Sequence, residues 1–254
     1  MSTRYVATNL TDLHREPSFL SELLTQVMLG VELEVLEEKE KWSRVRQTDG
    51  YEGWAYTHYL TDTAPPPPTH IIRTPLACAF AEKQESERPI MRLLGGTLVS
   101  ASVDGAWARL VQGFVGAQHL RPLPLASSRQ QMIADARQFS GTYYLWGGSS
   151  AWGIDCSGLA QLVHRLHGVN IPRDCYLQHP VGKPIEPPFR PGDLLYFRNE
   201  ARTKPGHVGI STGGNDGWHI IHSSRSHNGV YEEDVQANEN LRASFCGARS
   251  FFPE

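Results

Sequence analysis

The stretch that decides the fold is GTYYLWGGSSAWGIDCSGLAQLVHRLHG, residues 141–168. A glycine-rich turn opens it, and a segment with apolar side chains at the spacing of one helix face follows. Those side chains are Leu159, Leu162, Val163 and Leu166. Asp155 is suited to cap such a helix and Gly168 to end it. The stretch therefore predicts a helix with Cys156 at its first position.

Further helices and strands are predicted on both sides of this stretch. Upstream, SRQQMIADARQF predicts a helix that begins near Ser128. Downstream, short apolar runs predict strands at LLYF (194–197), HVGIS (207–211) and WHIIHS (218–223), and TGGNDG joins the last two as a hairpin. Helices followed by strands predict an α+β domain with an antiparallel sheet over residues 125–254.

The first 120 residues carry a weak internal repeat. VELEVLEE, KWSRV and GWAYTHYL recur in order as TLVSASV, AWARL and GFVGAQHL, so that Trp42 matches Trp107 and Tyr56 matches Gly116. Short alternating runs between turn residues are typical of small all-β barrels. The repeat therefore predicts two barrels, at residues 1–62 and 71–122, with the stiff spacer TAPPPPTH between them.

Composition and charge exclude several classes of protein. The chain has 254 residues with 24 basic and 27 acidic side chains and no basic stripe, so no nucleic-acid partner is expected. No run approaches the roughly 20 apolar residues of a spanning helix, so no membrane partner is expected. The opening MSTRYVATNL lacks the pattern of a secretory leader, which predicts a cytoplasmic protein.

The first barrel is the acidic part of the chain. Residues 1–62 hold 6 basic and 11 acidic side chains. Such a balance favours a cationic group on a ligand. A solvated acidic face is the alternative interpretation.

The cysteines are too few and too scattered for a disulfide framework, and none forms a Cys-x-x-Cys pair. Cys78 and Cys246 stand among small and apolar residues, which indicates buried side chains. No helix start or base is predicted for Cys175, which is interpreted as a cleft-lining or buried thiol. Cys156 differs, because a helix N-terminus favours the thiolate. A small buried residue at a helix start remains the alternative for Cys156.

A base for this thiol is available in the predicted hairpin. If the hairpin is centred near Asn215, His207 lies almost opposite His222, and side chains on one face of neighbouring strands meet. Strand alternation points His219 to the other face. His207 is therefore the predicted base and His222 the residue that orients it.

Metal chemistry is the competing hypothesis for the same histidines. His207, His219, His222 and His227 are zinc-ligand types, but parity separates His219 from His222 and no acidic ligand motif accompanies them. No metal and no other cofactor is therefore expected.

The motif order DCSG, RPGDLLYF, HVGIS and IIHSS resembles the NlpC-type cysteine peptidases over residues 128–250. The resemblance implies a papain-like core that cleaves γ-D-glutamyl bonds in peptidoglycan stem peptides. It implies Cys156 as nucleophile, His207 as base and His222 as third member.

The resemblance also assigns three residues around the nucleophile. It implies that Tyr144 lies near the oxyanion, that Trp146 forms a cleft wall and that Ser157 touches substrate. Hydrophobic core positions are the alternative for Tyr144 and Trp146.

The two barrels resemble bacterial SH3-like domains. With them, the chain is similar to γ-D-glutamyl-L-diamino-acid endopeptidases that recycle murein tri- and tetrapeptides with a free N-terminal L-Ala. That subgroup implies that Glu22, Tyr56 and Asp174 bind the substrate ammonium. A solvated Glu22 and a packing role for Tyr56 are the alternatives, although Gly116 at the matching position shows that the barrel itself does not require a tyrosine.

Two other functions stay open at this point. One is an exported peptidoglycan hydrolase with the barrels as wall-binding modules, and the other is a catalytically silent wall-peptide binder. The sequence leaves open L-Lys or diaminopimelate at the third substrate position, the oligomeric state and the role of the second barrel.

Overall fold

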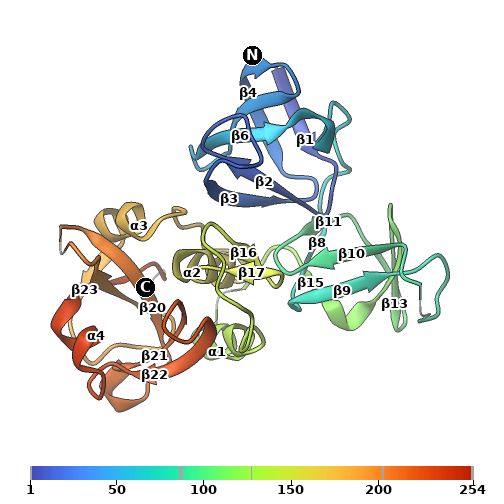
Figure 1. Ribbon diagram of the computed structural model, residues 1–254. Helices are drawn as coiled ribbons and strands as arrows, with labels where there is room; N and C mark the ends of the chain where they lie inside the picture. Colours follow the sequence, from blue (N-terminus) through green and yellow to red (C-terminus); the bar gives the residue numbers. More distant parts are fainter. Residues whose placement is uncertain (1, 86–87, 127, 202, 253–254) are drawn as a thin grey trace. The chain divides into compact units, whose positions relative to one another are not determined.

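The computed structural model describes residues 2–85, 88–126, 128–201 and 203–252, which form two compact units, Met1–Leu125 and Ala126–Glu254 (Figure 1). The boundary at Leu125 lies beside the predicted start of the α+β domain. Among the described residues, no helix has the length and apolar character to cross a lipid bilayer.

The first half of unit Met1–Leu125 is one antiparallel sheet in the order β3-β2-β6-β5-β4-β1-β7. Its strands are β1 (Ser2–Val6), β2 (Leu10–His14), β3 (Leu23–Met28), β4 (Glu32–Lys39), β5 (Trp42–Arg46), β6 (Glu52–Tyr56) and β7 (Leu60–Thr61). A 3-10 turn, η1 (Thr57–Tyr59), precedes the last strand. The alternation of the strands buries Leu13, Leu33 and Val45 completely, which makes the core of this barrel.

The second half of this unit consists of three smaller sheets around a separate core that includes Ile72, Leu93 and Val115. Its strands are β8 (His70–Ile72), β9 (Leu76–Ala79), β10 (Met91–Leu94), β11 (Leu98–Val99), β12 (Ser102–Asp104), β13 (Trp107–Leu110), β14 (Gly113–Gly116) and β15 (Leu120–Pro122). A 3-10 turn, η2 (Ala117–His119), precedes β15 as η1 precedes β7.

The strand register supports the internal repeat. Trp42 pairs with Tyr56 between β5 and β6, and Trp107 pairs with Gly116 between β13 and β14. Tyr56 and Gly116 then precede the equivalent 3-10 turns. Tyr56 and Gly116 therefore occupy the same place in two related hairpins, so the barrel fold does not demand the tyrosine.

Unit Ala126–Glu254 is an α+β domain around an antiparallel sheet in the order β18-β23-β19-β20-β21-β22. Its strands are β18 (Lys183–Ile185), β19 (Leu194–Arg198), β20 (Pro205–Ser211), β21 (His219–Ser224), β22 (Gly229–Asp234) and β23 (Phe245–Ser250). The helices are α1 (Arg129–Arg137), α2 (Cys156–Arg165), α3 (Cys175–Val181) and α4 (Glu239–Ser244). A short ribbon, β16 (Ser149–Ser150) with β17 (Gly153–Ile154), leads into α2.

Several local predictions are confirmed in this unit. Ser128 caps α1 and accepts a hydrogen bond from the Gln131 backbone at 3.3 Å. The helix that begins at Cys156 and the hairpin between β20 and β21 are present. The sequence prediction missed α3 and α4, because these helices have only 7 and 6 residues and show no clear periodicity.

Helix α2 packs its apolar face against β20 and β21. Leu159 and Val163 are fully buried on this face and Leu162 almost so. Burial of such side chains contributes about 1.5–3 kcal/mol each. The packing therefore holds the first turn of α2 against the strands that carry His207 and His222.

Candidate active site

Cys156 begins α2, as predicted, and is 7% exposed. The Asp155 carboxylate caps the helix and accepts the Gly158 backbone N–H at 2.6 Å. The Val208 backbone N–H, which is next to His207 on β20, donates a hydrogen bond to the Cys156 sulfur. The thiol is therefore held between a helix start and the strand of the predicted base.

The charge state of the thiol differs from the sequence expectation. Burial raises the pKa of Cys156 well above its ordinary value, and the neighbouring Cys175 and Asp155 raise it further. The Val208 hydrogen bond and Arg173 lower this pKa, but desolvation is the largest effect. The expected stabilisation of the thiolate is therefore wrong, and the Cys156 thiol needs a base to take its proton before it can act as a nucleophile.

The structure brings His207 and His222 into direct contact. His207 Nε2 lies 2.7 Å from His222 Nδ1, a hydrogen-bond distance. Ile210 pairs with Ile221 in this hairpin, so the two histidines are diagonal neighbours rather than opposite residues. An exactly opposite pairing of His207 with His222 would differ from this register by two residues, and an even offset keeps both side chains on the predicted face.

His219 lies away from this pair, as strand alternation predicts. Its Nδ1 atom contacts the Thr212 hydroxyl at 3.1 Å and Glu232 at 3.4 Å. Among the described residues, no three His, Cys, Asp or Glu side chains gather as a set that could hold a metal ion.

The hydrogen bond between the histidines determines which atom of His207 remains for proton transfer. Because Nε2 is bonded to His222, Nδ1 is the ring nitrogen left for the thiol. Burial, followed by the effect of His222, lowers the pKa of His207 to about 3. The imidazole is therefore neutral at neutral pH and able to accept the Cys156 proton.

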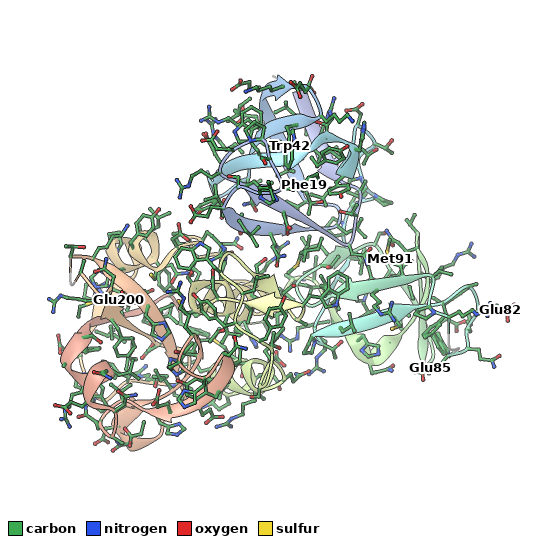
Figure 2. All side chains as sticks on the ribbon, viewed as in Figure 1. Phe19, Trp42, Glu82, Glu85, Met91 and Glu200 are labelled. Atoms are coloured by element: carbon green, nitrogen blue, oxygen red, sulfur yellow. The ribbon has the colours of Figure 1, made fainter. Side chains whose placement is uncertain are left out.

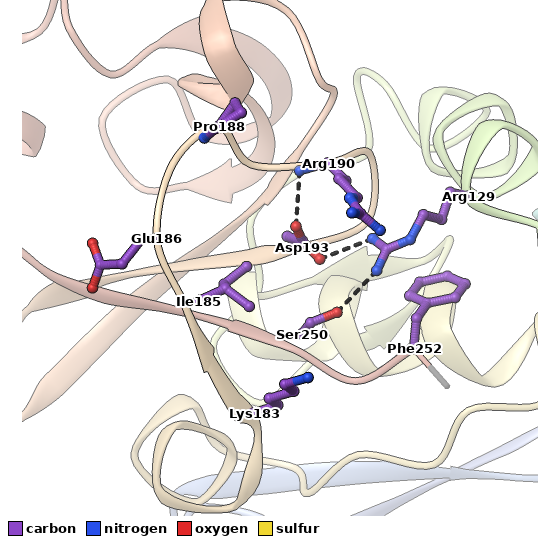
Figure 3. Close-up of a pocket in the computed structure, with 9 residues that line it drawn as sticks. All are labelled: Arg129, Lys183, Ile185, Glu186, Pro188, Arg190, Asp193, Ser250 and Phe252. Carbon is purple, nitrogen blue, oxygen red and sulfur yellow. Dashed lines mark hydrogen bonds and ion pairs between the residues drawn. The ribbon is translucent and has the colours of Figure 1, made fainter. Parts of the chain in front are cut away.

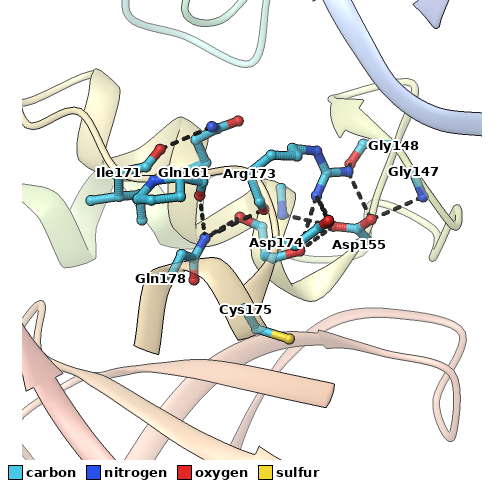
Figure 4. Close-up of polar contacts among 12 residues, drawn as sticks. Gly147, Gly148, Asp155, Gln161, Ile171, Arg173, Asp174, Cys175 and Gln178 are labelled. Atoms are coloured by element: carbon cyan, nitrogen blue, oxygen red, sulfur yellow. Dashed lines mark hydrogen bonds and ion pairs between the residues drawn. The ribbon is translucent and has the colours of Figure 1, made fainter. Parts of the chain in front are cut away.

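A buried arginine supports the start of α2, and sequence reasoning missed it (Figure 4). Arg173 is 1% exposed and donates to both carboxylate oxygens of Asp155, at 3.0 and 2.8 Å. It also donates to the Gly148 carbonyl at 3.2 Å. Asp155 accepts the Gly147 backbone N–H at 2.9 Å, so this network ties the glycine-rich turn to the start of α2, where Cys156 lies.

The predicted substrate contact of Ser157 is not favoured by its placement. Ser157 is buried, and its hydroxyl accepts from Arg173 at 2.9 Å and donates to Asp155 at 3.2 Å. A buried guanidinium needs acceptors for its N–H groups. Ser157 therefore belongs to the support of the helix start.

Tyr144 and Trp146 have different environments. Tyr144 is half-buried, and burial together with the nearby Cys156 and Asp155 raises the pKa of its phenol. The Tyr144 phenol is therefore near enough to Cys156 for the two groups to interact electrostatically. Trp146 is 54% exposed, and the Arg225 guanidinium carbon lies 5.8 Å from its ring centroid.

Asp174 and Cys175 stand at the start of α3, a helix that was not predicted. Asp174 is the N-cap residue, and its side chain is 22% exposed. Cys175 therefore does begin a helix, which corrects the sequence expectation. Its thiol is buried and contacts the Pro205 carbonyl at 3.4 Å, and burial raises its pKa to about 12. An inert thiol is the consistent interpretation.

Glu22 and Tyr56 lie on the first barrel. The Glu22 carboxylate pairs with Arg15 at 2.7 Å, and both side chains are solvent-accessible. Tyr56 is half-buried in an aromatic cluster, with ring centroids 5.1 Å from Phe19 and 5.6 Å from Trp42. Figure 2 shows Phe19 and Trp42 beside each other in this barrel.

A cavity of about 340 Å³ in unit Ala126–Glu254 is built from other residues (Figure 3). Arg129 lines the cavity and donates hydrogen bonds to the Asp193 carboxylate at 2.8 Å and to the Ser250 hydroxyl at 3.0 Å. None of the described residues that line the cavity is a cysteine or histidine. The cavity is therefore separate from Cys156 and the histidine pair.

His164, on α2, makes the stability of this unit sensitive to acid. It is fully buried, its Nδ1–H donates to the Ala160 carbonyl at 2.8 Å, and burial lowers its pKa to about 4. The unfolded chain binds the proton below about pH 6.5, whereas the folded chain does not. The free energy of unfolding should therefore fall as the pH falls from about 6.5 to about 4, on the order of 1.4 kcal/mol per pH unit.

The measurement is urea unfolding of the wild type and of His164→Leu across this pH range. In the variant, the free energy of unfolding should depend less steeply on pH. It should still fall with falling pH, because the pKa of His207 is also lowered. An equal pH dependence in both proteins would assign the acid sensitivity to other groups.

Comparison with known proteins agrees with the two-part organisation. Residues 141–249 match the NlpC/P60 family and residues 8–61 match the bacterial SH3 domain. The γ-D-glutamyl-L-lysine dipeptidyl-peptidase of Bacillus cereus is 28% identical, over 92% of this chain and 76% of that protein. The Bacillus subtilis protein of the same name is 27% identical, over 91% of this chain and 81% of that protein.

A solved structure extends the likeness to the whole fold. The crystal structure of an NlpC/P60 family protein from Bacillus cereus superposes with a TM-score of 0.86 at 20% identity, over 99% of this chain and 100% of that chain. At this identity, the likeness concerns the fold.

Proposed function

We propose that this chain, whose residues 141–249 match the NlpC/P60 family and whose residues 8–61 match the bacterial SH3 domain, hydrolyses the γ-D-glutamyl–diamino-acid bond of murein peptides. The observation that carries the proposal is the His207–His222 hydrogen bond beside a thiol at a helix start. Relatives named γ-D-glutamyl-L-lysine dipeptidyl-peptidases, which match most of the chain, support the same bond type.

The proposed reaction needs only side chains and backbone of the catalytic unit. His207 Nδ1 takes the thiol proton as the Cys156 sulfur attacks the γ-carbonyl. The Cys156 backbone N–H, at the positive end of α2, stabilises the oxygen that becomes charged. His207 then protonates the departing amine, and water hydrolyses the thioester to release the enzyme.

We further propose that the substrate is a short peptide with a free N-terminal L-Ala, as in cytoplasmic recycling of murein peptides. Asp174 is the candidate partner of the ammonium on the catalytic unit, and Glu22 and Tyr56 are the candidates on the first barrel. The Arg15 partner of Glu22 is no obstacle, because an exposed ion pair contributes only about 0–1 kcal/mol. Stem peptides in intact wall lack this free terminus.

The test is mass spectrometry of L-Ala-γ-D-Glu-diaminopimelate and its L-Lys analogue, each free and N-acetylated. We expect release of L-Ala-γ-D-Glu from the free peptides. The acetylated forms should react at least about 100-fold more slowly, because acetylation leaves carboxylates without a charged partner. Each candidate is tested by a single substitution: Asp174→Asn, Glu22→Gln or Tyr56→Phe. Each variant should show a smaller ratio of the cleavage rate of the free peptide to that of the acetylated peptide.

Other outcomes select between the alternatives. Equal cleavage of free and acetylated peptides would remove the ammonium recognition and favour an exported wall hydrolase. Binding without cleavage of any peptide would favour a silent wall-peptide binder.

A further inference from the structure

Glu233 contacts the ring nitrogen of His222 that does not face His207. Its Oε2 atom lies 3.3 Å from His222 Nε2, where the imidazole is 1% exposed and the carboxylate 19% exposed. Within the described part of the chain, Nε2 has no aligned hydrogen-bond partner. The carboxylate therefore acts on His222 mainly through its charge at short range.

Strand register places this carboxylate and turns its neighbour away. Tyr231 pairs with His222, and Glu233 follows two residues later on the same face of β22. Glu232 faces the other way and pairs with Arg137 at 2.6 Å. Two adjacent glutamates thus have different surroundings, and only one of them contacts His222.

Two further side chains hold Glu233 in this orientation. The Asn238 amide donates to Oε1 at 2.7 Å and the Tyr231 hydroxyl donates to Oε2 at 3.1 Å. The contact with His222 is the main reason that the pKa of Glu233 is lowered, to about 2. The carboxylate is therefore charged at neutral pH.

A charged carboxylate determines which nitrogen of His222 carries the proton. With the proton on Nε2, where the negative charge of Glu233 at 3.3 Å favours it, His222 Nδ1 presents a lone pair and accepts the His207 Nε2–H. His207 Nδ1 is then unprotonated and able to take the proton of Cys156. If His222 carried its proton on Nδ1 instead, the lone pair of its Nε2 would face the negative carboxylate. His222 Nδ1–H would then donate to His207 Nε2 and leave the proton of His207 on Nδ1, which prevents Nδ1 from acting as a base.

We propose that Glu233 is a positioning residue that selects the base-competent tautomer of His207 through His222. The inference rests on the proposed function, because it concerns the base of that reaction. Glu233 acts through His222 and not on the substrate.

The test compares Glu233→Gln with the matched control Glu232→Gln, which removes the same charge from the adjacent residue. In Glu233→Gln, kcat for the free tripeptide should fall by about 10- to 100-fold with KM within about twofold. Long-range ¹H–¹⁵N correlation spectra of the imidazoles should show the proton of His207 on Nε2 in the wild type and on Nδ1 in Glu233→Gln. Glu232→Gln should retain both the kcat and the tautomer of the wild type.

The spectra separate this inference from the proposed function. If the wild type cleaves no peptide, the function fails while the tautomer comparison still tests Glu233. An unchanged tautomer in Glu233→Gln would overturn the inference even if kcat fell, because the loss would then be structural. A shifted tautomer with unchanged kcat would overturn it as well.

Discussion

Replacing Cys156 with alanine is expected to abolish peptide hydrolysis, with a loss in kcat/KM of at least about 10⁴-fold. The thiol lies at the start of α2, its backbone neighbour Val208 is on the strand of His207, and no thioester can form without the sulfur. Alanine suits a helix start and removes one buried atom, so the fold should persist. Mass spectrometry of the free tripeptide measures the loss, and circular dichroism verifies the fold.

Cys246→Ala is the matched control, because Cys246 is a half-buried thiol of the same unit that contacts the Tyr196 carbonyl at 3.4 Å. This variant should retain the kcat/KM of the wild type. Activity of Cys156→Ala at the level of the control would show that another group is the nucleophile.

Replacing Arg173 with methionine is expected to lower the free energy of unfolding of unit Ala126–Glu254 by about 3–5 kcal/mol. Methionine keeps most of the length of the side chain but removes the charge that both oxygens of Asp155 contact. Asp155 would remain buried with a carboxylate that has lost its cationic partner. Urea unfolding of the variant and the wild type measures the difference.

The control for this change is Arg137→Met, which breaks an ion pair whose arginine is 54% exposed. A pair of this kind contributes about 0–1 kcal/mol. If Arg173→Met lost no more stability than the control, the backbone N–H groups of Gly147 and Gly158 would be sufficient to support the Asp155 carboxylate.

Local patterns predicted the elements of the site well. The Ser128 and Asp155 caps fall where the sequence places them, and each satisfies a backbone N–H of its own first turn. The choice of His222 over His219 also followed from the sequence, because strand alternation puts these two histidines on opposite faces and the predicted hairpin centre puts His222 on the face of His207. Caps and alternation depend on residues that are neighbours in the chain, so no tertiary information is needed.

The register of the hairpin needed the structure. The turn η3 (Asn215–Gly217) has positive φ at Asn215, Asp216 and Gly217. This turn sets the pairing of Ile210 with Ile221, two residues from an alignment in which His207 and His222 are exactly opposite. Turn conformation decides such a shift, and the turn residues alone left it open.

The sequence by itself determined a two-part chain: barrels built from a repeat, and an α+β domain with a thiol at a helix start and two histidines on one face of a hairpin. The tertiary structure alone decided the charge state of Cys156, the burial of Arg173 beneath Asp155 and the contact of Glu233 with His222. Desolvation and pairing of charges depend on which distant segments exclude water around a group. Those segments meet only when the chain is folded.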